Sequence, residues 1–242
     1  MVNSHTYNNH SIAKKNLCPK AVKILESLNK AGYEAYLVGG AVRDLLLDKQ
    51  PKDFDIATAA LPEEVKHTFR SCRLIGRRFR LAHVYFGREY FEVATFRAPH
   101  DSNSNSGKTA QDGRITHDNV YGTVEEDALR RDFTINALFY DLQNNRIIDY
   151  ANGMKDIKGK QIRLIGDPET RYREDPVRML RAVRFAVKLN FTIHPETEAP
   201  IYKMGSLLQN IAPARLFDEV LKLFHGGQAL ETFRALRHYD LF

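Results

Sequence analysis

Residues 37–58 read LVGGAVRDLLLDKQPKDFDIAT, a stretch in which two adjacent glycines are followed by two acids on either side of a phenylalanine. Side chains two positions apart on a strand point to the same face of a sheet. If FDIAT is a strand, Asp53 and Asp55 lie side by side and Phe54 points into a core. Two like charges this close repel each other unless water solvates both or a cation lies between them. The stretch therefore predicts either a solvated strand end or a cation site.

A magnesium ion is the cation that this pattern favours. Mg²⁺ prefers oxygen ligands and often binds one or two carboxylates together with substrate phosphates. Glu92, in the predicted strand at residues 90–97, is a third candidate ligand, because an acid among apolar strand residues costs free energy unless it is paired or metal-bound. The alternatives are an ordinary exposed turn for Asp53 and Asp55, and a salt bridge between Glu92 and either Arg97 or another nearby basic residue.

The two glycines lie between a predicted strand at residues 34–38 and a predicted helix that starts at Ala41. Glycine lets the backbone bend sharply and lets a ligand approach closely. The first N–H groups of a helix favour an anion, and Arg43 adds a fork of donors that suits a phosphate. Gly39, Gly40 and Arg43 therefore form a candidate phosphate site. The alternative is a plain turn between a strand and a helix.

Residues 130–137 read RRDFTINA and follow a predicted helix that has acids in its first turn. Arg131 can contact a phosphate, and Asp132 can accept hydrogen bonds from ribose hydroxyls. This motif is a second candidate contact for a nucleotide, and the alternative is an ordinary charged helix end.

Residues 174–185 read EDPVRMLRAVRF and predict a helix. Arg178, Arg181 and Arg184 recur every three residues, so they occupy one broad flank of that helix. Asp175 and Arg178 offer an acceptor and a set of donors that can hydrogen-bond the edge of a base. The alternative is a solvated basic face that is supported by ion pairs along the helix.

The chain divides by pattern into three parts: a flexible polar tail over residues 1–18, a mixed α/β region over 19–167 and a helical region over 168–242. Residues 98–119 contain turn formers and almost no apolar residues, which predicts a long loop. The last helical pattern continues to Phe242, which predicts that the helical region is truncated.

The composition is that of a globular protein, with 242 residues, of which 43% are hydrophobic and 27% charged. A formal net charge of +6 is weak support for a polyanionic partner. Cys18 and Cys72 lack a metal-ligand spacing and predict unbridged thiols in a reducing compartment. The sequence shows no apolar signal segment and no run long enough for a membrane span, so we expect a cytoplasmic protein without a membrane partner.

Taken together, these motifs resemble the class II branch of the nucleotidyltransferase superfamily, which contains the bacterial poly(A) polymerases and the CCA-adding enzymes. The segments LVGGAVRDLLL with DFD, RRDFTINAL and EDPVRMLRAVRF are similar to motifs of that family, and the resemblance covers about residues 35–225. RLIGRRFRLAHVYF at residues 73–86 resembles the bacterial poly(A) polymerase version, because CCA-adding relatives usually have a shorter segment with fewer arginines. The implied fold is α+β: a polymerase-beta-like nucleotidyltransferase head with a mixed sheet, followed by an all-helical neck and RNA-binding region.

The resemblance also implies roles for individual residues. Catalytic roles would fall to Asp53, Asp55 and Asp132. The Mg²⁺ ligands would be Asp53 and Asp55, with Glu92 as the third carboxylate. The nucleotide would be contacted by Gly39, Gly40, Arg43, Arg131, Asp132, Asp175, Arg178, Arg181 and Arg184. Members of the family commonly have glycine at the position of Asp48, and they continue well past the equivalent of Phe242.

The implied activity is template-independent transfer of AMP from ATP to the 3′ ends of RNA, with Mg²⁺ as the cofactor. The 3′-OH would attack the α-phosphate in line, and catalysis would depend on positioning and charge stabilisation. ATP and RNA 3′ ends are therefore the expected partners. Two alternatives stay open: a CCA-adding enzyme that acts on tRNA and uses CTP, and a non-catalytic RNA-binding fragment.

Overall fold

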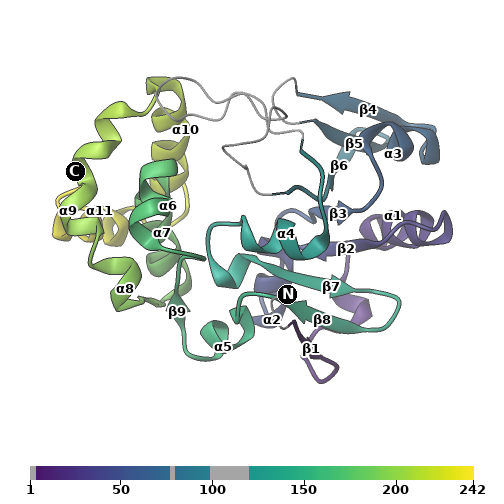
Figure 1. Ribbon diagram of the computed structural model, residues 1–242, viewed down its shortest axis with the longest axis horizontal. Helices are drawn as coiled ribbons and strands as arrows, with labels where there is room; N and C mark the ends of the chain where they lie inside the picture. The colour runs from purple at the N-terminus through teal and green to yellow at the C-terminus, as the bar shows by residue number, and fades with distance from the viewer. Residues whose placement is uncertain (1–3, 77–79, 99–119) are drawn as a thin grey trace. The chain divides into compact units, whose positions relative to one another are not determined.

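The structure is a computed structural model that describes residues 4–76, 80–98 and 120–242 (Figure 1). The chain forms two compact units, the first made of Met1–Arg131 and Asn136–Gly153 and the second of Asp132–Ile135 and Met154–Phe242. The predicted long loop lies outside the described residues, apart from its first position.

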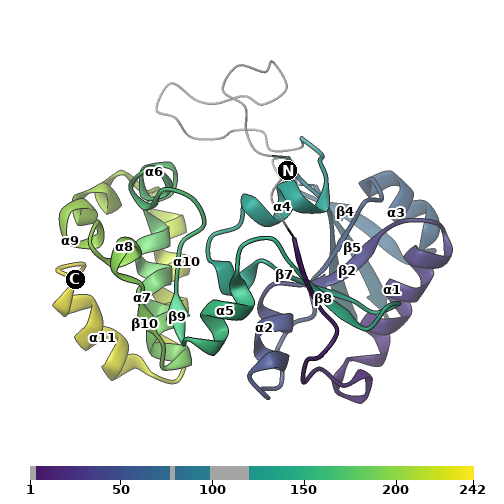
Figure 2. The same cartoon turned by 60° about the horizontal axis from the view of Figure 1, so that its bottom comes forward.

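An eight-stranded mixed sheet forms the centre of the first unit (Figures 1 and 2). Its strands, in spatial order, are β1 (His5–Tyr7), β8 (Arg146–Asp149), β7 (Leu138–Asp141), β2 (Ala35–Val38), β3 (Ile56–Thr58), β6 (Glu89–Thr95), β5 (Leu81–Phe86) and β4 (Cys72–Ile75). Strands β3 and β6 are parallel, with Ile56 opposite Val93, and the other neighbouring pairs are antiparallel.

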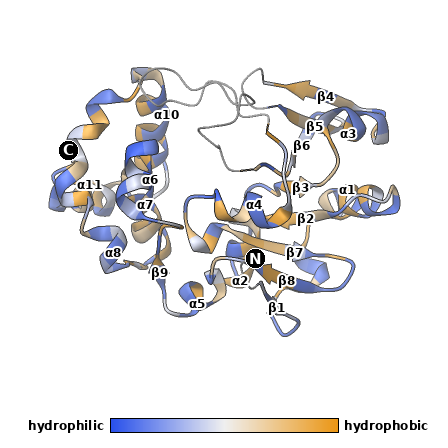
Figure 3. Ribbon diagram, in the orientation of Figure 1, coloured by the Kyte–Doolittle hydropathy of each residue, from blue (hydrophilic) through white to orange (hydrophobic). Residues whose placement is uncertain are grey.

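Helices pack on this sheet through apolar residues, and Figure 3 colours the hydrophobic segments of the ribbon orange. The helical elements are η1 (Lys14–Asn16), α1 (Pro19–Lys30), α2 (Gly40–Leu46), α3 (Pro62–Thr68) and α4 (Val124–Leu129), and η2 (Thr134–Asn136) spans the point where the chain returns to the first unit. Helix α1 buries Ile24, Leu25 and Leu28 at helical spacing and contacts β2 and β3, while α3 contacts β4, β5 and β6. Ala128 of α4 packs in a cluster with Tyr36.

The second unit is arranged around helix α7 (Val177–Leu189), which buries Met179, Leu180, Ala182 and Val183. The other elements are α5 (Gly153–Lys158), β9 (Gln161–Ile162), α6 (Pro168–Glu174), β10 (Thr192–Ile193), α8 (Pro195–Glu198), α9 (Ile201–Met204), η3 (Gly205–Asn210), α10 (Pro213–Phe224) and α11 (Ala229–His238). Helices α6, α10 and α11 contact α7. The prediction of a mixed sheet followed by a helical region is confirmed.

Three local predictions differ from the structure. The residues that the structure describes in the predicted flexible tail are ordered against the sheet, because β1 pairs with β8 and the side chains of Ile12 and Leu17 are buried. The region after residue 168 is not wholly helical, since β10 pairs in parallel with β9. Strand β3 begins at Ile56, so the two acids precede the strand rather than lie on it.

Two further observations agree with the sequence. Asp48 has a φ of 53°, the left-handed region that favours glycine and that aspartate tolerates better than most residues, so the glycine that the family resemblance implies here would suit this turn. In the part of the chain that the structure describes, no helix is both long enough and apolar enough to cross a membrane.

Candidate functional site

The two acids of the DFD motif lie at the edge of the sheet in the first unit. Phe54 is buried, whereas Asp53 and Asp55 on either side of it are exposed. The backbone N–H of Val38 donates to the carbonyl oxygen of Asp55 at 3.0 Å, which continues the pairing of β2 beyond the start of β3. Ile56 of β3 pairs with Val93 of β6, and Asp55 and Glu92 directly precede these two residues. The predicted alternation of buried and exposed side chains in the DFD motif is therefore present, although β3 is shorter than predicted.

A pocket with a volume of about 650 Å³ opens at this edge. Its acidic lining residues are Asp53, Asp55, Glu89 and Glu92, and its other lining residues include Lys52, Arg88 and Tyr90. Glu89 forms an ion pair with Lys20. Oε1 of Glu92 lies 3.7 Å from Nε2 of His83, so the structure shows the contact with a nearby basic residue that the alternative interpretation of Glu92 includes.

The surroundings of the Asp55 carboxyl in this pocket disfavour its ionised form. Burial by neighbouring atoms is the largest cause that raises its pKa to about 6; the nearby charges of Glu92 and Asp53 contribute to the rise, and Arg131 acts in the opposite direction. A cation bound between these carboxylates would relieve the repulsion. Among the described residues, no group of three or more acids, histidines and cysteines is arranged to hold a metal by itself. The residues fit an ion that takes one or two carboxylates and completes its shell with substrate oxygens, as Mg²⁺ does.

The glycine turn lies between β2 and α2. Gly39 has a φ of 67°, and a Cβ atom placed on it would lie 3.3 Å from Nη1 of Arg131. Its carbonyl oxygen accepts the backbone N–H of Arg43 at 3.1 Å, which closes the first turn of α2. A Cβ on Gly40 would make only ordinary contact, 3.5 Å from Nη2 of Arg43. Gly39 is therefore required by both its backbone conformation and the close approach of an arginine.

Arg43 lies behind this turn with only 3% of its surface exposed. Its Nε and Nη2 atoms donate to one carboxylate oxygen of Asp44 at 2.8 and 2.7 Å, and its Nη1 atom donates to the side-chain oxygen of Asn136 at 2.6 Å. These bonds connect helix α2 to the segment that precedes β7. Buried and bonded in this way, Arg43 is placed to position the turn.

Arg131 is fixed on the other side of the turn. It donates to a carboxylate oxygen of Asp127, one helical turn earlier, at 3.1 and 2.8 Å, and to the carbonyl oxygen of Asn136 at 3.4 Å. Its guanidinium group also lies 5.0 Å from the ring centre of Phe139, a cation–π contact. The positive charge of Arg131 is thereby held beside Gly39 and near enough to Asp55 to affect its pKa.

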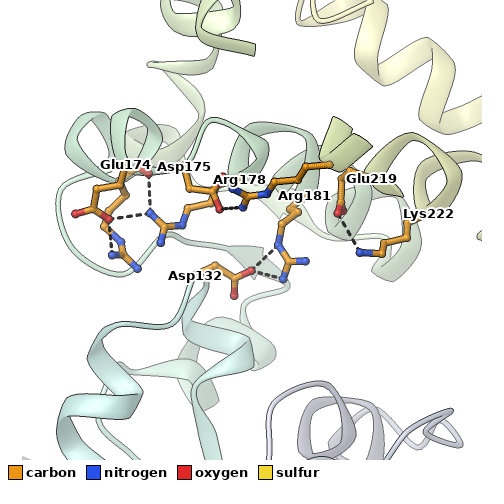
Figure 4. A network of polar contacts seen from close by, with 9 residues as sticks. Asp132, Glu174, Asp175, Arg178, Arg181, Glu219 and Lys222 are labelled. Atoms are coloured by element: carbon orange, nitrogen blue, oxygen red, sulfur yellow. Dashed lines mark hydrogen bonds and ion pairs between the residues drawn. The ribbon is translucent and has the colours of Figure 1, made fainter. Parts of the chain in front are cut away.

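The second unit contains a network of arginines and carboxylates on and around α7 (Figure 4). Asp132 accepts hydrogen bonds from Nε and Nη2 of Arg181 at 2.8 and 2.5 Å, and its other carboxylate oxygen accepts the N–H of Phe133 at 2.7 Å. Arg178 donates to Glu174 at 2.9 Å. Each of these arginines therefore has a carboxylate partner, and Arg178 shares Glu174 with Arg171.

Arg184 is paired in the same way, with Glu219 of α10 at 3.0 Å. The three α7 arginines expose only 14–29% of their side chains, so the solvated face of the predicted alternative is not seen, whereas its ion-pair support is present between Glu174 and Arg178. Asp175 forms an ion pair with Arg215 at 2.6 Å.

Comparison with known proteins identifies the family. The sequence matches the family described as "Poly A polymerase head domain" over residues 35–163, more than half of the chain. This chain belongs to the poly(A) polymerase head-domain family. A second family, described as "Probable RNA and SrmB- binding site of polymerase A", matches residues 190–242. The resemblance inferred from the motifs is confirmed.

The chain is similar to individual members of the family over most of its own length. It is 58% identical to Poly(A) polymerase I of Salmonella typhimurium and 55% identical to that of Haemophilus influenzae, in each case over 96% of the chain. It is 43% identical to a CCA-adding enzyme of Lactobacillus helveticus over 89% of the chain. The chain covers 51 to 52% of these proteins, so it spans about half the length of the curated relatives it matches.

A solved structure supports the fold prediction. The CCA-adding enzyme of Bacillus stearothermophilus in complex with CTP superposes with a TM-score of 0.78 and 38% sequence identity, over 93% of this chain and 53% of that one. The predicted nucleotidyltransferase head with a mixed sheet, followed by a helical region, is confirmed by this likeness and by the family match.

The structure groups the predicted site residues of this poly(A) polymerase head in two sets. In the first unit, Asp53, Asp55 and Glu92 line one pocket, and Arg131 lies against Gly39. In the second unit, Asp132 is bound to Arg181. Asp175 and Arg178, which the sequence suggests as a pair for reading a base edge, each bind a different partner. The functional roles of these residues stay predictions.

Sequence reasoning missed the residues that hold the site in place. Asp127 could have been found, because it lies four residues before Arg131 on a predicted helix and that spacing favours an ion pair. Asp44 is adjacent to Arg43 in the motif already singled out. Glu219 gives no local signal, since its partner Arg184 lies on another helix.

Substituting Gly39 tests the close approach of Arg131. We expect Gly39→Ala to lower the free energy of unfolding by about 2–3 kcal/mol, because it combines backbone strain with a Cβ contact at 3.3 Å. Gly87→Ala is a matched control, since Gly87 has a φ of 66° and nothing within 4 Å of its Cβ position. Urea denaturation should show a smaller loss for the control, and equal losses would mean that Arg131 does not constrain the turn.

The raised pKa of Asp55 predicts a pH-dependent stability. The folded carboxyl holds its proton more tightly than the unfolded one, so this contribution to stability is complete below about pH 4 and is lost as the pH rises through about 6. Asp55→Asn should therefore stabilise the metal-free chain by about 1 kcal/mol at pH 7–8, after allowance for solvent screening, and leave it unchanged near pH 4. Thermal unfolding at both pH values measures this, and a stabilisation that is equal at pH 4 and 8 would contradict it.

Proposed function

We propose that this chain transfers AMP from ATP to the 3′ end of RNA without a template, as the name of its relatives, Poly(A) polymerase I, suggests. The observation that carries the proposal is the group of three carboxylates in the pocket, where the charges of Glu92 and Asp53 help to raise the pKa of Asp55 beside a glycine turn. Such a group suits a reaction in which a cation and a triphosphate must meet.

Asp53 and Asp55 would hold Mg²⁺, and Glu92 is the third carboxylate within range of the same charge. Mg²⁺ bound there would lower the pKa of the RNA 3′-OH and neutralise charge on the pyrophosphate that leaves. Asp55 must be ionised to act as a ligand, so metal binding and protonation compete for this carboxyl.

The glycine turn would receive the triphosphate. The backbone at Gly39 and Gly40 carries no side chain that could block a phosphate, and Arg131 supplies a fixed positive charge beside it. Arg43 would act as a positioning residue, because its Nε, Nη1 and Nη2 atoms already donate to Asp44 and Asn136. This role differs from the direct phosphate contact that the family resemblance implies for Arg43.

The second unit would recognise the nucleoside. Asp132 would accept from the ribose hydroxyls, and the α7 arginines with Asp175 would contact base and phosphates. The ion pairs of this network hold the side chains in fixed rotamers before a nucleotide binds, which lowers the entropy cost of binding.

In the reaction, the RNA 3′ oxygen forms a bond to the α-phosphorus of ATP. The bond between that phosphorus and the oxygen that bridges to the β-phosphate breaks, and pyrophosphate leaves with the bridging oxygen. The proton of the 3′-OH passes to solvent. The chain contributes mainly position and charge, because phosphoryl transfer needs no covalent intermediate with the protein.

Isotope labelling of ATP tests this step. With an unstructured RNA and Mg²⁺, label at the α-phosphate should enter the RNA, and label at the γ-phosphate should appear only in pyrophosphate. Transfer of the γ label to RNA would show phosphorylation of the RNA and would overturn the proposal.

A CCA-adding activity is the second candidate, because the chain is 43% identical to a CCA-adding enzyme and superposes on one in complex with CTP. Use of CTP on a tRNA that lacks its 3′ end would favour it. A third candidate is a non-catalytic RNA-binding fragment, because the chain spans about half the length of its relatives. Mg²⁺-dependent ATP binding without any extension of RNA would favour that candidate.

A further inference from the structure

The outer strands of the sheet in the first unit carry a row of polar and aromatic side chains. Strands β4, β5 and β6 are neighbours (Figure 1), with Arg73 opposite His83 and His83 opposite Glu92. In the next row, Tyr85 is opposite Tyr90. Since residues two apart on a strand share a face, all five side chains lie on one face of the sheet.

Three of these side chains form an aromatic cluster. The rings of His83 and Tyr90 are stacked, with centroids 4.3 Å apart and an interplanar angle of 8°. The ring of Tyr85 lies 5.8 Å from that of Tyr90, and the guanidinium group of Arg73 lies 5.5 Å from the ring of Tyr85. Cross-strand packing explains why such rings meet. It does not explain why Tyr90 keeps 49% of its surface exposed with a ring face that His83 does not cover.

This cluster is continuous with the carboxylate site. Tyr90 lines the same pocket as Asp53 and Asp55, and Glu92 belongs to both the row and the pocket. Lys52 and Arg88 line that pocket too, so positive charge is available beside an exposed aromatic ring. Exposed aromatic rings with nearby basic side chains bind single-stranded nucleic acid, because every base can stack and the backbone is anionic.

We infer that the face made by Arg73, His83, Tyr85 and Tyr90 binds the last nucleotides of the RNA primer, with a base stacked on Tyr90. The inference rests on the proposed function, which requires the RNA 3′-OH to reach Asp53 and Asp55. An RNA chain that enters the pocket past Tyr90 arrives at those carboxylates. Lys52, Arg73 and Arg88 contact its phosphates, and the stacking is independent of sequence.

The test replaces the ring while keeping the bulk of the side chain. In Tyr90→Leu, the KM for an unstructured oligoadenylate should rise about tenfold, as expected for the loss of one stacked base. The KM for ATP and the kcat at saturating RNA should not change. Tyr90→Phe keeps the ring and should behave as the unsubstituted chain. Tyr33→Leu is the control, because Tyr33 is a partly exposed tyrosine of the same unit that lies after α1, outside the carboxylate pocket and outside residues 190–242.

An unchanged KM for RNA in Tyr90→Leu would overturn the inference, and so would an equal rise in Tyr33→Leu or in Tyr90→Phe. The affinity of each variant for fluorescent oligoadenylate, measured by anisotropy without ATP, separates this inference from the proposed function. If the unsubstituted chain transfers no AMP but Tyr90→Leu still binds RNA about tenfold more weakly, the proposed function fails and the RNA surface stands. If transfer proceeds and the RNA affinities are equal, the RNA surface fails alone.

Discussion

Asp53→Asn and Asp55→Asn are each expected to lower the rate of AMP transfer about a thousandfold or more. Each substitution removes a negative charge and a metal ligand, and a bound metal supplies several kcal/mol of stabilisation to the transition state, with 1.36 kcal/mol for each factor of ten. Both acids are exposed, and the stability of Asp55→Asn should not fall, so the loss reflects chemistry rather than unfolding. Single-turnover transfer from ATP labelled at the α-phosphate measures the effect.

Glu89→Gln is the matched control for this prediction. Glu89 lines the same pocket but is paired with Lys20, and it lies outside the proposed ligand set. Transfer by this variant should remain within a fewfold of the unsubstituted chain. If Glu89→Gln and Asp55→Asn lose the same activity, the pocket acts through its total charge, and the assignment of Asp53 and Asp55 as ligands fails.

The second large expected effect is a loss of stability when Glu219 is substituted. This residue is only 4% exposed, and its carboxylate lies 3.0 Å from Arg184 and 3.3 Å from Lys222. Glu219→Leu leaves the largely buried guanidinium of Arg184 without its partner, and removal of one member of a buried ion pair costs about 3–5 kcal/mol. Urea denaturation followed by circular dichroism measures the change in the free energy of unfolding.

Two comparisons make this prediction specific. Glu26→Gln removes one member of an exposed pair, with Lys14 at 3.2 Å, and should cost less than about 1 kcal/mol. Combining Glu219→Leu with Arg184→Met removes both charges and should recover part of the loss. If the combined variant is less stable than the sum of the two single variants predicts, the pair does not stabilise the fold through its charges.

Local patterns explain which parts of the fold were predictable. Helix α1 was visible because its apolar residues recur at helical spacing and Gly32 follows it, and α7 was visible for the same periodicity. The DFD motif predicted that Phe54 is buried and that Asp53 and Asp55 are exposed. This alternation of buried and exposed side chains is present although strand β3 begins only after the motif. In each case the signal lies within a few residues.

The remainder depends on contacts between distant residues. Strand β1 pairs with β8 about 140 residues later, so nothing near His5 distinguishes an ordered strand from a tail. The burial of Arg43 depends on Asn136, which the chain brings close only after several strands have formed. The ion pair of Glu219 with Arg184 could not be predicted from the sequence for the same reason. Side-chain partners of this kind decide whether an arginine contacts a ligand or holds its neighbours.

Nucleotide choice is the measurement that tests the central claim most directly. The chain would be incubated with Mg²⁺ and either ATP or CTP, on an unstructured RNA and on a tRNA that lacks its 3′ end. The account predicts extension of the unstructured RNA with ATP, repeated over many additions, and loss of that extension in Asp53→Asn and Asp55→Asn. Short additions confined to the tRNA and beginning with CTP would contradict it.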